Sequence, residues 1–140
     1  MNYQISLFII LLLWGGMILG ISCLEAWVKF RTPSLDRIVA LDVGYTVFRA
    51  FHRVQWGIWL LLLVIYYRLF YQLWWLALLL GLILFLQTIY LMPCLHRQIG
   101  LLRTAQVSSG KPYVHRIYML CEAVKLLLLL STACYFLFKL

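Results

Sequence analysis

Four long stretches that carry almost no charge constrain this chain more than any other feature. Residues 1–24 and 73–92 contain no Asp, Glu, Lys or Arg, and each is long enough to cross a bilayer as a helix. Residues 54–67 and 126–138 are also uncharged but shorter than a span, so their helices must include neighbouring polar residues. With 66% hydrophobic and 11% charged residues, a chain of 140 residues has too much apolar surface for a soluble domain. The sequence predicts an all-α integral membrane protein, a bundle of four transmembrane helices.

The order of apolar stretches and helix breakers predicts one domain, residues 1–140. Pro33 separates the first span from an amphipathic segment, residues 34–53. No breaker follows, so this segment should continue into the second span as one long helix. Pro93 should end the third span and precede a second amphipathic segment, residues 94–107. The four spans are expected at about residues 4–29, 50–68, 73–92 and 114–138.

The distribution of Lys and Arg predicts the orientation. The net charge is +8, and most cations lie in or beside the first and third loops, whereas the opposite side has only Arg68 and Lys139. The positive-inside rule places those two loops in the cytoplasm. Both termini would then be periplasmic, in a bacterial inner membrane. The cations should contact anionic lipid headgroups. Nucleic acid is not an expected partner, because no phosphate loop, basic-aromatic strand or zinc spacing is present.

The last span predicts a polar network inside the bundle. It cannot cross a bilayer without including Glu122 and Lys125, which are costly in lipid unless they are paired. We expect both side chains to face the interior, with Asp42 and Arg49 as neighbours. The network should lie in the cytoplasmic half and serve either as a ligand site or as an ion-pair lock between helices. Its expected members are Glu25, Lys29, Asp42, Arg49, Arg53, His115, Tyr118, Glu122 and Lys125.

Several functions are consistent with such a bundle. The leading hypothesis is a binding or transport protein without intrinsic catalysis, and a subunit of a larger membrane complex or a homo-oligomer is an alternative. Glu122, His115 and Asp42 could act as acids or bases, but no nucleophile with an adjacent base and no metal-ligand spacing appears. Another alternative is an enzyme or haem protein in which His52 and His115 ligate the iron. No other cofactor is expected.

Three segments carry a resemblance to a known family. They are GGMILGISCLEAWVKF at residues 15–30, ALDVGYTVFRAFHRV at residues 40–54, and a final span that opens with His115. They resemble a family of small bacterial four-helix membrane proteins of unknown function, distantly similar to a eukaryotic transmembrane protein linked to platinum-drug resistance. In that family a Gly-rich first helix ends in an aromatic residue, the second helix opens with a Gly and an aromatic-basic pair, and the fourth helix carries a His. The corresponding residues are Phe30, Gly44, Phe48, Arg49 and His115. The resemblance implies the fold and the membrane location, but no activity.

Overall fold

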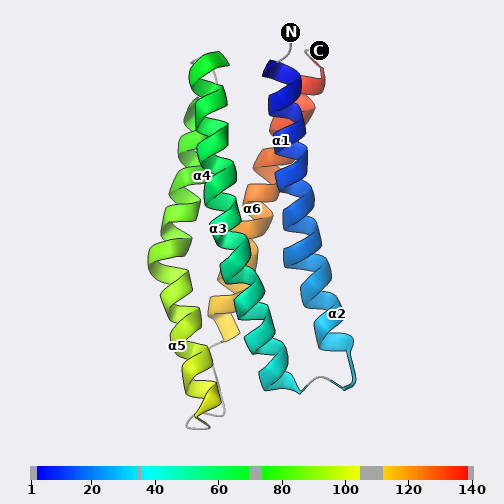
Figure 1. Ribbon diagram of the computed structural model, residues 1–140, viewed down its shortest axis with the longest axis vertical. Helices are drawn as coiled ribbons and strands as arrows, with labels where there is room; N and C mark the ends of the chain where they lie inside the picture. The colour runs from blue at the N-terminus through cyan, green and yellow to red at the C-terminus, as the bar shows by residue number, and fades with distance from the viewer. Residues whose placement is uncertain (1–2, 35, 70–73, 105–111, 139–140) are drawn as a thin grey trace.

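Four helical rods lie side by side in the structure, with both chain ends at the same end of the bundle (Figure 1). The computed structural model describes residues 3–34, 36–69, 74–104 and 112–138, and all regular structure within these residues is helical. The two labels beginning with η mark π-helical turns inside longer rods. The elements in chain order are α1 (Tyr3–Met17), η1 (Ile18–Glu25), α2 (Ala26–Arg31), α3 (Arg37–Leu69), α4 (Trp74–Leu86), η2 (Gln87–Leu91), α5 (Met92–Arg103) and α6 (Pro112–Leu137).

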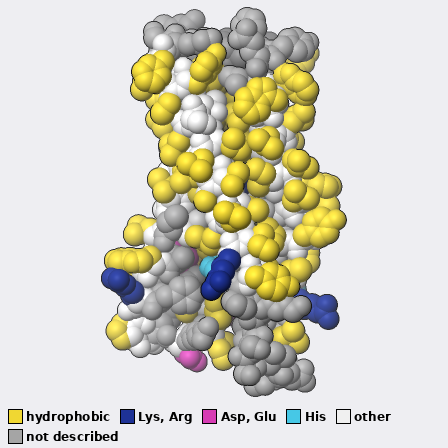
Figure 2. Space-filling view, turned by 180° about the vertical axis from the view of Figure 1, so that it is seen from behind, with side chains coloured by type: hydrophobic (Ala, Val, Ile, Leu, Met, Phe, Trp, Pro, Cys, Tyr) yellow, Lys and Arg dark blue, Asp and Glu magenta, His cyan; other side chains and the backbone are white. Residues whose placement is uncertain are grey.

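Each rod contains a segment that is long and apolar enough to cross a membrane. These segments are Ile5–Ser22, Ile38–Tyr67, Trp74–Leu101 and Tyr113–Leu137. On the face that Figure 2 shows, large apolar side chains cover the bundle over most of its length, whereas the described Lys and Arg side chains lie towards the end opposite the termini. An apolar outer surface of this extent belongs in contact with lipid. The structure therefore confirms the predicted class, a helical integral membrane protein with four packed spans.

The core of the bundle consists of large apolar side chains from all four rods. Leu11 and Trp14 come from α1, Leu62 from α3, Leu80 from α4 and Leu129 from α6, and all five are completely buried. The first rod packs on both α3 and α6. This part of the interior is hydrophobic, so the charged and amide side chains buried elsewhere in the bundle differ from their surroundings.

The second rod is one uninterrupted helix, as the sequence predicts. The carbonyl of Asp36 accepts a hydrogen bond of 2.8 Å from the backbone N–H of Ala40, which places the N-cap at Asp36 and the first helical residue at Arg37. At 33 residues, α3 is about 50 Å long, well beyond a hydrocarbon core of about 30 Å. Its first turns therefore extend beyond the hydrocarbon core, at the end of the bundle where the charged residues lie.

The prediction that Pro93 ends the third helix is wrong. The helix continues through α4, η2 and α5 to Arg103. In η2 the backbone N–H of Met92 donates to the carbonyl of Gln87, five residues earlier. This wider π-helical turn stands just before the proline, where an α-helix would suffer from the missing N–H and the clash with the preceding turn. The predicted amphipathic segment 94–107 is thus part of the third rod as far as Arg103; residue 104 is in a turn, and residues 105–107 lie outside the described part.

A tryptophan and a glycine bring α3 and α4 close together. The indole N–H of Trp59 donates a hydrogen bond of 2.8 Å to the backbone carbonyl of Ala77. A Cβ atom added at Gly81 would lie 2.5 Å from Cζ2 of that indole. The ring therefore occupies the space that any side chain at Gly81 would need, and this contact fixes the spacing of the two rods.

Candidate functional site

Four polar side chains meet at the centre of the bundle. Gln55 comes from α3, Gln87 from η2, and Glu122 and Lys125 from α6, and none is more than 1% exposed. We call these four residues the buried quartet. Glu122 and Lys125 face the interior, in agreement with the length argument from the sequence. The quartet lies near the midpoints of α3 and α6, nearer the centre of the bundle than the sequence argument places it.

The quartet satisfies its own hydrogen bonds. The ammonium group of Lys125 donates to Glu122 Oε1 at 2.8 Å, to Gln87 Oε1 at 2.9 Å, and to Gln55 Oε1. The amide of Gln87 donates to Glu122 Oε1 at 3.0 Å, and the amide of Gln55 lies 3.3 Å from both carboxylate oxygens. An ammonium has three donors, and all three are used here.

This arrangement makes the quartet a cross-link between helices. Its net charge is zero, and every nitrogen and oxygen of its head groups has a partner within the set. Buried ion pairs are tolerated when the remaining lone pairs and protons are satisfied in this way. The quartet joins the second, third and fourth rods, while the first rod adds apolar packing.

The two other predicted residues on α6 lie beside the quartet, towards the charged end. Tyr118 is completely buried one turn before Glu122, with its ring centroid 5.2 Å from that of Phe48. Its hydroxyl has no hydrogen-bond partner among the described residues. His115 is half-buried, and its ring centroid lies 5.9 Å from that of Phe48. Both residues thus pack on α3 through one phenylalanine.

The remaining predicted members of the network lie elsewhere. Arg49 and Arg53 are on the exposed side of α3. Asp42 is half-buried on the same helix, thirteen residues before Gln55, which is about 20 Å along the axis. Glu25 is half-buried at the end of η1, and the side chain of Lys29 lies outside the described part. The neighbours that the structure places around Glu122 and Lys125 are instead two glutamines.

A sequence signal for those glutamines does exist. Gln55 and Gln87 are amides within otherwise apolar stretches. Polar side chains in such positions commonly form hydrogen bonds between transmembrane helices. Counting only charged residues in the apolar stretches overlooks this signal.

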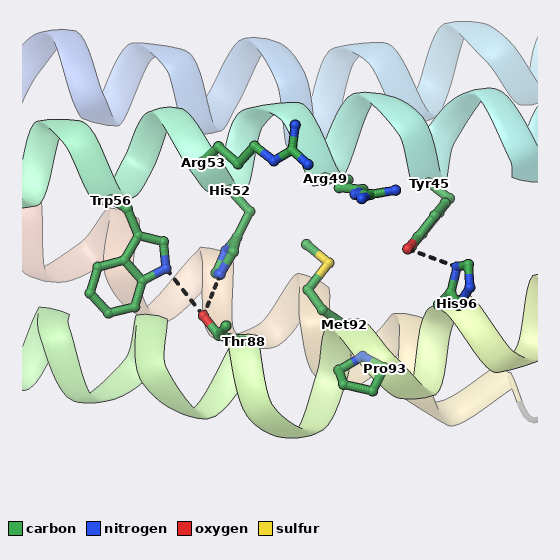
Figure 3. A pocket seen from close by; sticks show the side chains of 9 residues that line it. All are labelled: Tyr45, Arg49, His52, Arg53, Trp56, Thr88, Met92, Pro93 and His96. Carbon is green, nitrogen blue, oxygen red and sulfur yellow. Dashed lines mark hydrogen bonds between the residues drawn. The ribbon is translucent and has the colours of Figure 1, made fainter.

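A groove on the outside of the bundle lies next to the quartet. It has a volume of about 420 Å³ and lies between α3 on one side and η2 and α5 on the other (Figure 3). We call it the α3–α5 groove. Its lining residues are Tyr45, Arg49, His52, Arg53, Trp56, Thr88, Met92, Pro93 and His96.

Hydrogen bonds hold the polar floor of the groove. Figure 3 shows His52 and Trp56 reaching from α3 to the hydroxyl of Thr88. The distances to Thr88 Oγ1 are 2.8 Å from His52 Nε2 and 3.1 Å from Trp56 Nε1. Nearer the charged end, the hydroxyl of Tyr45 lies 3.0 Å from Nδ1 of His96. Each side of the groove is thus fixed to the other by polar contacts.

The two arginines of the groove have unused donors. Arg49 and Arg53 are one turn apart on α3, and neither has an ion pair or a hydrogen bond to any described residue. A guanidinium carries five N–H donors arranged to match a carboxylate or a phosphate. Phe85 and Ile89 of the third rod are exposed apolar residues; Ile89 follows Thr88 directly, and Phe85 lies three residues before Thr88, on the same helix face. The groove therefore combines unpaired positive charge with an adjoining apolar surface.

The groove and the quartet share the same helical turns. Gln55 precedes Trp56 on α3, and Gln87 precedes Thr88 on η2. In each pair the first residue points into the quartet and the second lines the groove. The quartet consequently fixes the rotation of both turns that supply the floor of the groove.

The two histidines considered as haem ligands have different neighbours. Nε2 of His52 is bonded to Thr88, whereas His115 packs against Phe48. Haem ligation by this pair stays a prediction, which an absorption spectrum of the purified protein tests. Within the described residues, no three His, Cys, Asp or Glu side chains are grouped so that they could hold a metal ion.

No family model, curated protein or solved structure matches this chain. The resemblance to the small bacterial four-helix proteins stays an expectation, and the functional argument therefore depends on the site itself.

Proposed function

We propose that this protein binds an anionic amphiphile by its headgroup in the α3–α5 groove. One observation carries the proposal: Arg49 and Arg53 line a groove of about 420 Å³ on the side of the bundle and have no partner among the described residues. Under the positive-inside orientation, the groove faces the cytoplasmic leaflet. Basic pockets of this kind between transmembrane helices are sites for anionic headgroups.

The chemistry of the lining supports an anionic headgroup. Two guanidinium groups separated by one helical turn can both reach a single phosphate or carboxylate, and such charge-assisted hydrogen bonds are stronger than neutral ones. Trp56 and Tyr45 add aromatic groups that favour the boundary between headgroups and hydrocarbon. The exposed Phe85 and Ile89 offer an apolar surface to the acyl chain of a bound amphiphile.

The structure of the buried quartet favours a binding function over a transport function. Its ammonium, carboxylate and amide groups are all engaged with one another at the centre of the bundle. A charged ligand that crossed the bundle there would have to separate them. We therefore assign the quartet the role of a rigid support for the groove. A role as a subunit of a larger complex is compatible with the same groove, but no separate observation favours it.

Lipid retention in native mass spectrometry tests the proposal. Protein extracted from nanodiscs with a mixture of zwitterionic and anionic phospholipids should retain anionic lipid. The double variant Arg49→Gln/Arg53→Gln should lose at least about tenfold in affinity, because each charge-assisted hydrogen bond contributes about 1.5–3 kcal/mol. Arg116→Gln is the matched control, since Arg116 is an exposed arginine outside the groove. Equal retention by the double variant and the control would contradict the proposal.

A further inference from the structure

The lining of the α3–α5 groove carries fixed positive charge without acidic groups. Arg49 and Arg53 lie one turn apart and share one face of α3. No Asp or Glu is among the described residues that line the groove. Neither arginine has an ion pair or a hydrogen bond with the described part of the chain. Two positive charges in one groove are therefore left for a ligand to balance.

His96 brings a further donor from the opposite side of the groove. It is an exposed residue of α5, and its Nδ1 lies 3.0 Å from the hydroxyl of Tyr45 on α3. When this hydroxyl donates to Nδ1, the neutral ring carries its proton on Nε2. When the ring is charged, Nδ1 donates to the hydroxyl and Nε2 is protonated as well. In both forms His96 keeps its contact with Tyr45 and presents an N–H on Nε2.

The three donors lie along one short stretch of the groove. Tyr45, which holds His96, is four residues before Arg49 on α3, about 6 Å along the helix axis. Figure 3 shows the side chains of Arg49 and Arg53 extended along α3 in the direction of Tyr45. All of these residues line the same groove. One small anionic group can therefore be reached by both guanidinium groups from α3 and by the imidazole from α5.

We propose that the ligand of the α3–α5 groove is an amphiphile with a terminal phosphate, a phosphomonoester such as phosphatidic acid; this inference rests on the function proposed above. A phosphomonoester carries about 1.5 to 2 negative charges at pH 7, which balances Arg49 and Arg53. It also has three terminal oxygens, one for each donor group of Arg49, Arg53 and His96. A phosphodiester has a single charge and two such oxygens, so it matches the groove less well.

Two lipids that differ by one methyl group test this assignment. Phosphatidic acid has a terminal phosphate, and phosphatidylmethanol is the same lipid with that phosphate capped as a methyl ester. In nanodisc titrations read by native mass spectrometry, the protein should bind phosphatidic acid at least about tenfold more tightly, the effect of one further charge-assisted hydrogen bond. Equal affinities for the two lipids would overturn the inference. So would tighter binding of cardiolipin, which carries its two charges on separate phosphodiesters.

Two variants on α5 test the role of His96. His96→Phe keeps a ring but removes both nitrogens, so the preference for phosphatidic acid over phosphatidylmethanol should largely disappear. Arg97→Gln is the matched control, because Arg97 is the next residue on the helix and is exposed but outside the lining of the groove. The control should keep the full preference. A preference that survives His96→Phe would refute the third donor.

A third measurement uses the unmodified protein and does not depend on the folding of a variant. Two nearby cations favour the more highly charged form of a phosphate. At a pH where free phosphatidic acid in the bilayer is a mixture of monoanion and dianion, the ³¹P signal of the bound lipid should therefore lie at the dianion position. In protein with ¹⁵N-labelled histidine, His96 should carry a proton on Nε2, and this signal should shift when phosphatidic acid is added. A bound monoanion, or an unprotonated Nε2, would contradict the inference.

The outcomes separate this inference from the proposed function. If neither anionic lipid binds more tightly than phosphatidylcholine, the proposed function fails, and the inference fails with it. If both anionic lipids bind equally and Arg49→Gln/Arg53→Gln weakens both, the function stands and the phosphomonoester is excluded. If soluble glycerol phosphate displaces bound phosphatidic acid at similar concentrations, the terminal phosphate is the recognised group and the assignment of a lipid is overturned.

Discussion

Lys125 donates a hydrogen bond of 2.8 Å to Glu122, one turn earlier on α6, and neither side chain is more than 1% exposed. The pair is held from α3 and η2 by two amides that bond both the ammonium and the carboxylate. The group of four residues at the centre of the apolar bundle therefore has no net charge, and each polar atom of the charge pair has a hydrogen-bond partner. This relationship determines how the bundle should respond to substitution.

Lys125→Met should destabilise the fold strongly. It removes the ammonium and leaves the Glu122 carboxylate buried without its counter-charge, which costs about 3–5 kcal/mol in comparable cases. The double variant Glu122→Gln/Lys125→Met removes both charges and keeps the side-chain volumes close to the original. We expect it to recover most of the lost stability, measured by unfolding in detergent with increasing denaturant. A double variant as unstable as the single one would show that the ion pair itself stabilises the fold, beyond avoiding an unpaired buried charge.

Gly81→Ala should destabilise the contact between α3 and α4. The new Cβ would lie 2.5 Å from the indole of Trp59, which cannot move away without breaking its hydrogen bond to Ala77. Overpacking of this kind costs about 1–3 kcal/mol. Gly57→Ala is the control, because nothing lies within 4 Å of a Cβ built there. The control should gain up to about 1 kcal/mol from better helix propensity. Thermal melts of both variants in one detergent give the comparison, and equal melting temperatures would refute it.

Thr88→Val should loosen the floor of the groove. It removes the hydroxyl that is hydrogen-bonded to both His52 and Trp56, so two ring nitrogens lose their partner, at a cost of about 1–3 kcal/mol each if they stay unpaired. Thr46→Val is the matched control, since Thr46 is exposed and bonds only to the backbone carbonyl of Asp42. Surface changes of this type usually stay within about 0.5 kcal/mol. Unfolding curves should separate the two variants, and similar losses would contradict the assigned role of Thr88.

Cysteine labelling should locate the charged end of the bundle in the cytoplasm. Ser34 and Thr104 are exposed at that end, beyond α2 and α5, whereas Phe138 is exposed at the end where both termini lie. In a chain whose native cysteines are replaced, a membrane-impermeant reagent added to intact cells should label cysteine at 138 only. Labelling at 34 or 104 from outside would reverse the proposed orientation.

The sequence alone determined the class of the fold and the inward orientation of one charged pair. Four uncharged stretches require lipid around them, because no soluble domain of this size can bury so much apolar surface. The absence of a breaker between residues 35 and 67 predicts the long α3. The short apolar part of the last span forces Glu122 and Lys125 into the bundle, where a lone charge is costly. Each of these conclusions follows from length, composition and local pattern.

Only the tertiary structure decided which residues form a site. Gln55 and Gln87 come from different rods, and their meeting with Glu122 and Lys125 depends on how each helix is rotated about its axis. The π-helical turn of η2, just before Pro93, contributes to that rotation. The sequence pattern did not predict this turn. Arg49 shares α3 with Gln55 yet lines the outer groove, because a helix presents its residues to different sides every 3.6 positions. Periodicity along one helix cannot show which side meets which neighbour, since that choice depends on the packing of all four rods.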